Sequence, residues 1–387
     1  MKARYLYKLR PGSTAVAALR AEHTLTRWVW NECVHQFRSG NKPTAAKLDK
    51  LLSAARRDAD WLRAGSSVVQ QQEIRTYAAA LHHSFMVPGR QRPRPKTRKR
   101  NPYVSLNYTR NGFRIVDGRL RLAGGVVVPV VWSRELPTEP SSVRVYEDAA
   151  GWWWASFVVD VEPDTRPPAP DTSVGIDWGI STTATATDPE LDLSCREVAA
   201  RHARNLTRYQ RRMARHKQQR DDEERKAYRR AKKAAAREHR KIRWQRKEHA
   251  RQWAQKVAAT HHNVAVENFT PKFLAKSTMA RKMHNAALRA LRSELENAVE
   301  RRGGNLVAVP AAYTTMTCST CGVRAKHRLP LSQRVFRCGD CGYICDRDLN
   351  AARNVRAWAG FNPTLDDGCQ SATLSGVGAA ESGIPTL

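Results

Sequence analysis

The sequence contains no apolar run of about 18 residues or more, and this excludes a membrane-spanning helix. No internal repeat of about 20 to 50 residues is apparent, so a solenoid or propeller is not predicted. Acidic residues are scarce, with 36 Asp and Glu against 67 Lys and Arg, which gives a formal net charge of +31. Such an excess causes self-repulsion in a compact protein, so the composition predicts a polyanionic partner.

A secretory signal peptide is also missing, so we expect a reducing, cytoplasmic environment in which stable disulfides do not form. The basic residues lie throughout the chain and not on one juxtamembrane helix, which disfavours binding to a membrane surface. The length of 387 residues suits two or three domains with cores of their own.

Four of the cysteines form two CxxC pairs, Cys318/Cys321 and Cys338/Cys341, and each pair is followed at once by glycine. This pattern is typical of zinc knuckles, in which a tight turn directs two thiolates at one ion. Two knuckles in succession predict a tetrahedral four-cysteine Zn²⁺ site of zinc-ribbon type. Disulfides or unrelated thiols are the alternative, which the reducing environment disfavours. Cys345 lies outside both knuckles and is not included in the site.

Three carboxylates stand in specific settings. Asp177 follows a short apolar strand and precedes a glycine turn and a second strand, which is how RNase H-like folds place their first metal-binding carboxylate. Glu267 ends another apolar strand, and Asp348 precedes an alanine-rich helical run, near a helix N-terminus. Each setting is common by chance. The ordered set, with a zinc ribbon directly before the third member, is much more specific.

On these residues the chain resembles the TnpB family, the RNA-guided nucleases of insertion sequences that are related to compact type V CRISPR effectors. Asp177, Glu267 and Asp348 match the three RuvC motifs in order, and the four cysteines match the family's ribbon. The stretch 283–287 departs from the family pattern after the second motif. The resemblance implies an RNA-guided DNA endonuclease of a transposable element, with a guide RNA and target double-stranded DNA as partners. It also implies a prokaryotic cytoplasm, with association with the nucleoid when DNA is bound.

The ligand types predict which metals bind. Three converging carboxylates repel one another unless divalent cations neutralise them, and hard oxygen ligands favour Mg²⁺ or Mn²⁺. Two such ions can support in-line hydrolysis of a phosphodiester. The resemblance implies that Asp177 is shared by both ions, with Glu267 and Asp348 each completing one shell.

Other functions stay open at this point. A nuclease-inactive RNA-guided DNA-binding regulator would be expected to lack one of the carboxylates. A compact type V CRISPR effector would share the whole motif set. A transposase acting alone would need a nucleophilic tyrosine or an integrase-type triad; the tyrosines lie in strand or helix patterns without a HuH-like partner, which ranks this function low. A monomer is the expected oligomeric state.

The predicted fold class is an α/β RNase H-like (RuvC) nuclease domain with an inserted zinc ribbon, plus an N-terminal β-barrel carrying an inserted helical module. The expected segments are a wedge-type barrel (1–10 and 101–162), a helical recognition module with a basic loop (11–100), a linker (163–171), the nuclease domain (172–312 and 345–360) with a basic helical insertion (197–258), the ribbon (313–344) and a disordered tail (361–387).

Local patterns predict the individual elements. Ser13 or Thr14 is expected to cap the first helix. Apolar stripes at helical spacing predict core side chains; they are Trp30, Cys33, Val34 and Phe37, and then Ile74, Tyr77, Leu81 and Phe85. The barrel strands are expected at Lys2–Leu9, Phe113–Val116, Arg119–Leu122, Val126–Val131, Val143–Tyr146 and Trp152–Val161. One helix is expected from Lys282 to Arg302 and a strand from Leu306 to Val309.

Two basic segments are candidates for nucleic-acid backbone contacts. The first is Gly89–Arg100, whose prolines and charge predict a flexible exposed loop. The second is Glu197–Ala258, expected to form two antiparallel helices hinged near Gln218–Asp222, with too few acidic residues to be laced by internal ion pairs alone. The candidate residues are Arg98, Lys99, Arg100, Arg211, Arg212, Arg229, Arg230, Lys232 and Lys233. Alternation along Trp152–Trp154 places at least one of these rings in the core.

Overall fold

The computed structural model describes residues 1–41, 43–163, 167–218, 220–268, 279–327, 329–330 and 333–361. Parts of the expected linker at 164–166 and of the expected tail at 362–387 lie outside these residues. The chain divides into two compact units. The first comprises Met1–Glu162 with Arg204–Lys241, and the second comprises Pro163–Ala203 with the chain from Ile242 onward.

An antiparallel, nearly closed sheet of seven strands forms the base of the first unit, in the order β2-β6-β7-β1-β5-β4-β3. The strands are β1 Lys2–Leu9, β2 Ser105–Thr109, β3 Phe113–Val116, β4 Arg119–Leu122, β5 Val126–Val131, β6 Ser142–Glu147 and β7 Trp153–Asp160. The sequence analysis named six of these and missed β2, which places only Leu106 and Tyr108 in the core. The short helix η1 (Arg110–Gly112) joins β2 to β3.

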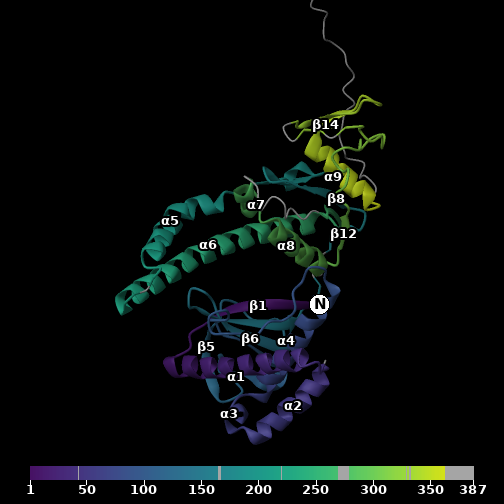
Figure 1. Cartoon of the computed structure of the whole chain (residues 1–387). Helices are drawn as coiled ribbons and strands as arrows, with labels where there is room; N and C mark the ends of the chain where they lie inside the picture. Colours follow the sequence, from purple (N-terminus) through teal and green to yellow (C-terminus); the bar gives the residue numbers. More distant parts are fainter. Residues whose placement is uncertain are drawn as a thin grey trace, which may run out of the picture. The chain divides into compact units, whose positions relative to one another are not determined.

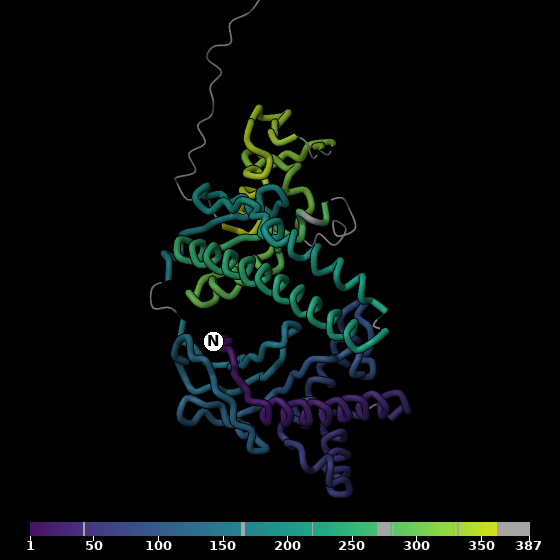
Figure 2. The backbone as a smooth tube through the Cα atoms, turned by 90° about the vertical axis from the view of Figure 1, so that its left-hand side faces the viewer, coloured from purple at the N-terminus to yellow at the C-terminus, as the bar shows by residue number. Residues whose placement is uncertain are grey.

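A helical module is inserted between β1 and β2, and Figure 2 shows β1 leading directly into its first helix. Its helices are α1 Ser13–Arg38, α2 Ala45–Asp58, α3 Asp60–Arg63 and α4 Ser67–Met86. Trp30, Cys33 and Tyr77 are buried in its core as predicted. Phe85 is not in the core: it is 56% exposed, with the Arg92 guanidinium 4.7 Å from its ring centre. The cap prediction was also wrong, because Gly12 takes the cap position of α1 without a side-chain hydrogen bond.

The second unit contains a mixed sheet of five strands in the order β10-β9-β8-β11-β12. The strands are β8 Ser173–Trp178, β9 Thr182–Ala186, β10 Leu193–Ser194, β11 Asn263–Glu267 and β12 Asn305–Val309. β8, β11 and β12 are parallel, whereas β9 and β10 run antiparallel to their neighbours. The apolar β8 and β11 are buried along almost their whole length, as expected for strands covered on both faces.

Helices cover both faces of this sheet (Figure 1). They are the C-terminal part of α6 (Asp222–Thr260), α7 Ala280–Ala286, α8 Leu288–Arg301 and α9 Arg347–Trp358. The short η2 (Pro189–Leu191) precedes β10, and α5 (Val198–Arg215), which has no buried residue, follows it. Trp253 of α6 and Leu295 of α8 pack on one face, and Val355 of α9 packs on the other. The expected single helix from Lys282 to Arg302 is divided, because Ala287 adopts a left-handed conformation with φ of 50°. The expected break near Gln218–Asp222 is confirmed between α5 and α6.

Glycine at position 175 allows α9 to lie directly on β8. A Cβ atom built there would lie 2.1 Å from the backbone oxygen of Ala352 and 2.8 Å from Arg356 Cβ. Any larger residue would therefore push α9 away from the sheet. Between β12 and α9 lies a small module with one hairpin, β13 Val335–Arg337 and β14 Ile344–Asp346. Within the described part of the chain, no helix has the length and apolar character needed to cross a membrane.

Candidate functional site

The parallel pairing of β8 and β11 brings two of the predicted carboxylates together. Ile176 lies opposite Val266 in the register, so Asp177 and Glu267 follow at the same edge of the sheet. Both residues are 6% exposed. The carboxyl ends of neighbouring parallel strands are a common place for functional side chains in α/β sheets.

Two groups that the sequence analysis did not single out hold Glu267 in place. The buried Thr314 hydroxyl donates a hydrogen bond of 2.8 Å to Glu267 Oε1. The Trp178 indole N–H donates to the Glu267 backbone oxygen at 3.1 Å. Thr314 lies 47 residues from Glu267 in the sequence, and no local pattern links the two.

The third carboxylate comes from the first turn of α9, and the structure separates the roles of two neighbouring aspartates. Asp346 is the N-cap, and its Oδ1 accepts from the backbone N–H groups of Asp348 and Leu349 at 2.8 and 3.0 Å. Asp348 therefore does not serve as the cap. Its carboxylate pairs with Arg334 at 3.0 Å and lies 3.8 Å from the Arg347 guanidinium.

The electrostatics of the three carboxylates show that they share one environment. The pKa of Asp177 is well above its usual value because of burial, and the nearby charges of Glu267 and Asp348 raise it further, while Arg347 opposes them. Burial raises the pKa of Glu267 to about 7, against the lowering effect of the Thr314 hydrogen bond. Crowded, buried negative charges of this kind suit a divalent cation, which would remove the repulsion.

The four predicted cysteines converge on one point, because their sulfur atoms all lie within 4.8 Å of one another. The Sγ–Sγ distances are 3.7 Å for Cys318 and Cys341 and 3.6 Å for Cys321 and Cys338. This donor set fits one Zn²⁺ with tetrahedral thiolate ligands. Cys345 lies on β14, outside the cluster, as expected.

The local backbone explains why each pair ends in glycine. Gly322 and Gly342 have φ values of 77° and 74°, a region that strains residues with a Cβ atom. Backbone N–H groups point at the thiolates, and those of Cys341 and Asp340 lower the pKa of Cys338 to about 7. The thiolate form of Cys338 is thereby favoured, whereas the pKa values of Cys321 and Cys341 are raised in the absence of a metal, so binding of an ion would release their protons.

The cysteine module is tied to α9 by two buried asparagines. Asn350 accepts from the Ser319 N–H at 3.0 Å and donates to the Thr317 oxygen at 2.8 Å. Asn354 donates to the backbone oxygens of Thr314 and Thr317 at 2.8 and 2.6 Å. The module and the helix carrying Asp348 are therefore linked directly.

Comparison with known proteins assigns this chain to a family. Residues 156–278, which include Asp177 and Glu267, match a family described as "Probable transposase" (OrfB_IS605). Residues 289–355, which include the cysteine cluster and Asp348, match a "Cas12f1-like, TNB domain". A Streptomyces pristinaespiralis protein named "Putative RNA-guided DNA endonuclease" is 33% identical over 305 residues, which cover 76% of this chain and 71% of the relative. The chain belongs to the TnpB family.

Other matches extend over more of this TnpB-family chain. The Escherichia coli (strain K12) protein "Putative RNA-guided DNA endonuclease InsQ" is 25% identical over 383 residues, which cover 91% of each chain. A solved cryo-EM complex of Cas12f1 with sgRNA and target DNA has a TM-score of 0.52 at 15% identity, covering 87% of this chain and 81% of that one. The structural likeness supports the fold assignment alone.

The nine basic residues predicted to contact nucleic acid are all exposed, and they belong to the loop before β2 and to helices α5 and α6 of the TnpB-family chain. At Lys96 this loop contacts the helical module. Lys96 pairs with Glu73, and its backbone exchanges hydrogen bonds with Asn31. Arg98, Lys99 and Arg100 lie beyond this anchor.

The three tryptophans on β7 and the turn before it are structural. Trp153 lies in the barrel core, while Trp152 and Trp154 stack on the other face with ring centres 6.2 Å apart. Arg240 of α6 lies 3.7 Å from the Trp152 ring centre and pairs with Asp148 at 3.3 Å. The basic side chain of Arg240 therefore helps to hold α6 on the barrel.

Proposed function

We propose that this TnpB-family protein is an RNA-guided DNA endonuclease of a transposable element, which cuts DNA at the site formed by Asp177, Glu267 and Asp348. The observation that carries the proposal is that Asp177 and Glu267 are buried at the same edge of the sheet and that the charges of Glu267 and Asp348 raise the pKa of Asp177 further. Two relatives are named as RNA-guided DNA endonucleases, which supports the same activity. The strand order, with a hairpin followed by parallel strands, supports an RNase H-like (RuvC) type of centre.

In this proposal Asp177, Glu267 and Asp348 would hold Mg²⁺ or Mn²⁺. Such ions would supply activation of a water molecule and stabilisation of the leaving oxygen in the hydrolysis of a phosphodiester. Thr314 orients the Glu267 carboxylate, and the Asp346 cap fixes the first turn of α9 so that Asp348 keeps its position. Arg334 and Arg347 neutralise Asp348 when no cation is present.

The four cysteines hold one structural Zn²⁺, and the basic residues contact the backbones of a guide RNA and of target double-stranded DNA. Contacts to phosphates supply affinity and position, whereas base pairing with a guide supplies sequence. The net charge of +31 and the exposed basic side chains on α5 and α6 support contacts to the phosphate backbone. The protein acts as a monomer in the prokaryotic cytoplasm in this proposal, with the barrel and its helices forming one part and the sheet and ribbon the other.

The test compares two neighbouring aspartates in cleavage of a guide-matched plasmid in Mg²⁺. Asp348→Asn should abolish cutting, by about a thousandfold or more, as expected when an electrostatic catalytic group is removed. Asp346→Asn is the matched control: asparagine caps helices as well as aspartate, so this variant should still cut. Asp177→Asn and Glu267→Gln should behave like Asp348→Asn, while guide and target binding stays largely intact.

The opposite result for the two aspartates would move the metal ligand to Asp346. The alternative function is a nuclease-inactive RNA-guided regulator, and it would take over if the wild-type protein with its native guide RNA cut no matched target. The presence of all three carboxylates favours the nuclease. A CRISPR array beside the gene, in place of a transposon end, would indicate a compact type V effector instead.

A further inference from the structure

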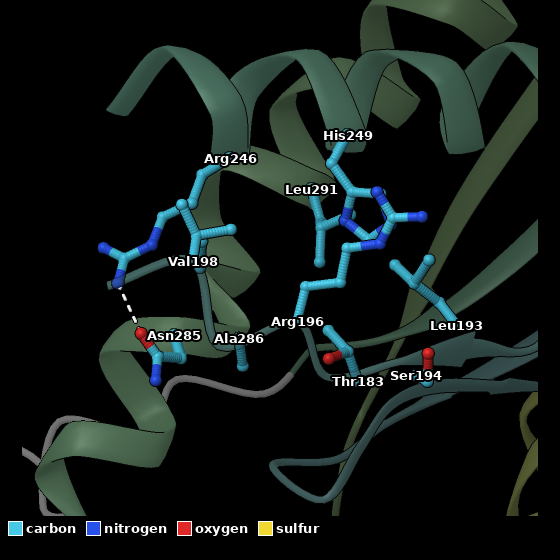
Figure 3. A pocket seen from close by; sticks show the side chains of 11 residues that line it. Thr183, Leu193, Ser194, Arg196, Val198, Arg246, His249, Asn285, Ala286 and Leu291 are labelled. Atoms are coloured by element: carbon cyan, nitrogen blue, oxygen red, sulfur yellow. Dashed lines mark hydrogen bonds between the residues drawn. The ribbon is translucent and has the colours of Figure 1, made fainter. Parts of the chain in front are cut away.

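A polar pocket that none of the three carboxylates lines lies in the second unit, between the β9–β10 edge and helices α5 to α8 (Figure 3). It is a shallow pocket that is partly open to solvent. Its polar lining comes from three basic side chains, two hydroxyls and one amide. They are Arg196, Arg246, His249, Thr183, Ser194 and Asn285.

The charge in this pocket is of one sign. None of its lining residues is Asp or Glu, although two arginines and a histidine meet there. Burial lowers the pKa of His249, and the Arg196 charge lowers it further. Burial also lowers the pKa of Arg246. Two guanidinium groups and an imidazole without an acidic neighbour in the lining leave a place for an anion.

The hydrogen bonds of Arg246 also indicate a site for an anion. One terminal nitrogen of its guanidinium donates to Asn285 Oδ1 at 2.6 Å, whereas the buried Nε has no partner among the described residues. A guanidinium has donors only, so an acceptor is required to complete it. Figure 3 shows Arg196 reaching across the pocket to the side of His249, with Thr183 and Ser194 beneath. A tetrahedral oxyanion would find donors on several sides of this pocket.

The pocket borders the carboxylate edge of the sheet. Thr183 accepts a hydrogen bond at its backbone oxygen from the N–H of Gly179, at 3.2 Å, and Gly179 follows Asp177 by two residues. We propose that the pocket binds a backbone phosphodiester of the nucleic-acid strand that passes the carboxylates, and so positions that strand. The inference rests on the proposed function for the identity of the strand, and the phosphate chemistry is carried by the pocket alone.

The test uses the full-length protein without guide RNA, so that it depends on neither guiding nor cleavage. The probe is the trinucleotide dTpTpT, which has two internal phosphodiesters and no terminal phosphate. Calorimetry should show that Arg196→Gln binds it about tenfold more weakly than the wild type, as expected for loss of a hydrogen bond to a charged group. Arg243→Gln is the matched control, because Arg243 is exposed on the same helix as Arg246 and does not line the pocket.

Two further comparisons identify the source of the phosphate. The neutral methylphosphonate analogue of dTpTpT should bind the wild type and Arg196→Gln equally. Arg246→Lys keeps the charge but removes the planar fork, and it should also weaken dTpTpT binding. Equal binding of dTpTpT by wild type, Arg196→Gln and Arg246→Lys would overturn the proposal. Discrimination of inorganic phosphate without discrimination of dTpTpT would overturn it too, in favour of a free-anion site. Cutting by Asp177→Asn would instead count against the proposed function alone.

Discussion

At the scale of single residues, the fold buries two of the three carboxylates of the proposed metal site. Asp177 and Glu267 are buried, and Thr314 is the hydrogen-bond donor that stabilises the charged form of Glu267. A carboxylate with a raised pKa is more costly to ionise in the folded protein than in the unfolded chain. The folded protein therefore favours the protonated carboxyl groups, and a divalent cation bound at the proposed site would displace the protons.

This preference predicts a pH dependence of stability in the absence of added divalent cations. The pKa of Glu267 rises from about 4.3 in the unfolded chain to about 7, so the folded state binds more protons between these values. Stability should therefore fall as pH rises from about 4.3 to about 7 and then level off, by on the order of 3 kcal/mol for this group. Glu267→Gln has no charge to lose and should not show this component.

The measurement is the Tm of both proteins from pH 5 to pH 8, with and without added Mg²⁺. The Tm of Glu267→Gln relative to the wild type should rise with pH, and Mg²⁺ should reduce this difference by stabilising the wild type. A Tm difference that stays constant over the whole range would show that Glu267 titrates normally.

At the scale of elements, the sequence predicted what is local and missed what depends on distant contacts. An apolar run before a carboxylate is visible in the sequence at Asp177 and Glu267; β11 ends at Glu267 as predicted, and β8 continues one residue past Asp177. Asp348 and Asp346 are two residues apart, and only the structure shows that Asp346 is the cap. The fit of Gly175 against α9 and the link from Thr314 to Glu267 join segments far apart in the chain, so no local pattern reveals them.

The missed elements have similar causes. The strand Ser105–Thr109 has only two inward residues, too few for a clear alternation. The helix expected from Lys282 to Arg302 has no Gly or Pro at the point where it divides, because Ala287 itself adopts the left-handed conformation. The contact of Lys96 with Glu73 could not be predicted, because this ion pair joins two segments that are separate in the sequence.

The cysteine module should fail as one element when its ion is removed. Cys338→Ser together with Cys341→Ser should release the zinc, since small ribbons fold around the ion. Asn350 and Asn354 bind α9 to this module, so loss of its fold should also displace Asp348 and abolish cleavage. Binding of RNA should change little, because the predicted contacts lie on α5, α6 and the loop before β2.

Elemental analysis of purified protein measures the zinc directly, and Cys345→Ser is the matched control. Cys345 is a free thiol in the neighbouring strand, outside the cluster, so this variant should retain one zinc per chain and cut normally. Full zinc in the double variant would show that the four thiolates are not the ligands.

At the scale of the whole molecule, the excess of basic residues divides into two groups. Some basic residues stabilise the fold: Lys96 pairs with Glu73, and Arg240 pairs with Asp148 and lies over the Trp152 ring. Others, such as Arg229 and Arg230 on α6, are exposed and have no acidic residue recorded within ion-pair distance among the described residues. The overall charge comes from both groups, but only the second can displace the counterions of a nucleic acid.

This division predicts different effects for two substitutions on the same helix. Affinity for structured RNA and duplex DNA should fall steeply with salt, and Arg229→Gln with Arg230→Gln should reduce the slope of log K against log salt by about 1 to 2. Arg240→Gln removes one charge as well, but its side chain is 13% exposed and committed to Asp148. It should leave the slope almost unchanged and lower the free energy of unfolding by about 2 kcal/mol, because Asp148 is left buried without its cation.

Binding isotherms at several salt concentrations and thermal unfolding of each variant measure both effects. An affinity independent of salt would contradict the proposed backbone contacts, and an equal loss of slope in Arg240→Gln would place Arg240 on the nucleic-acid surface.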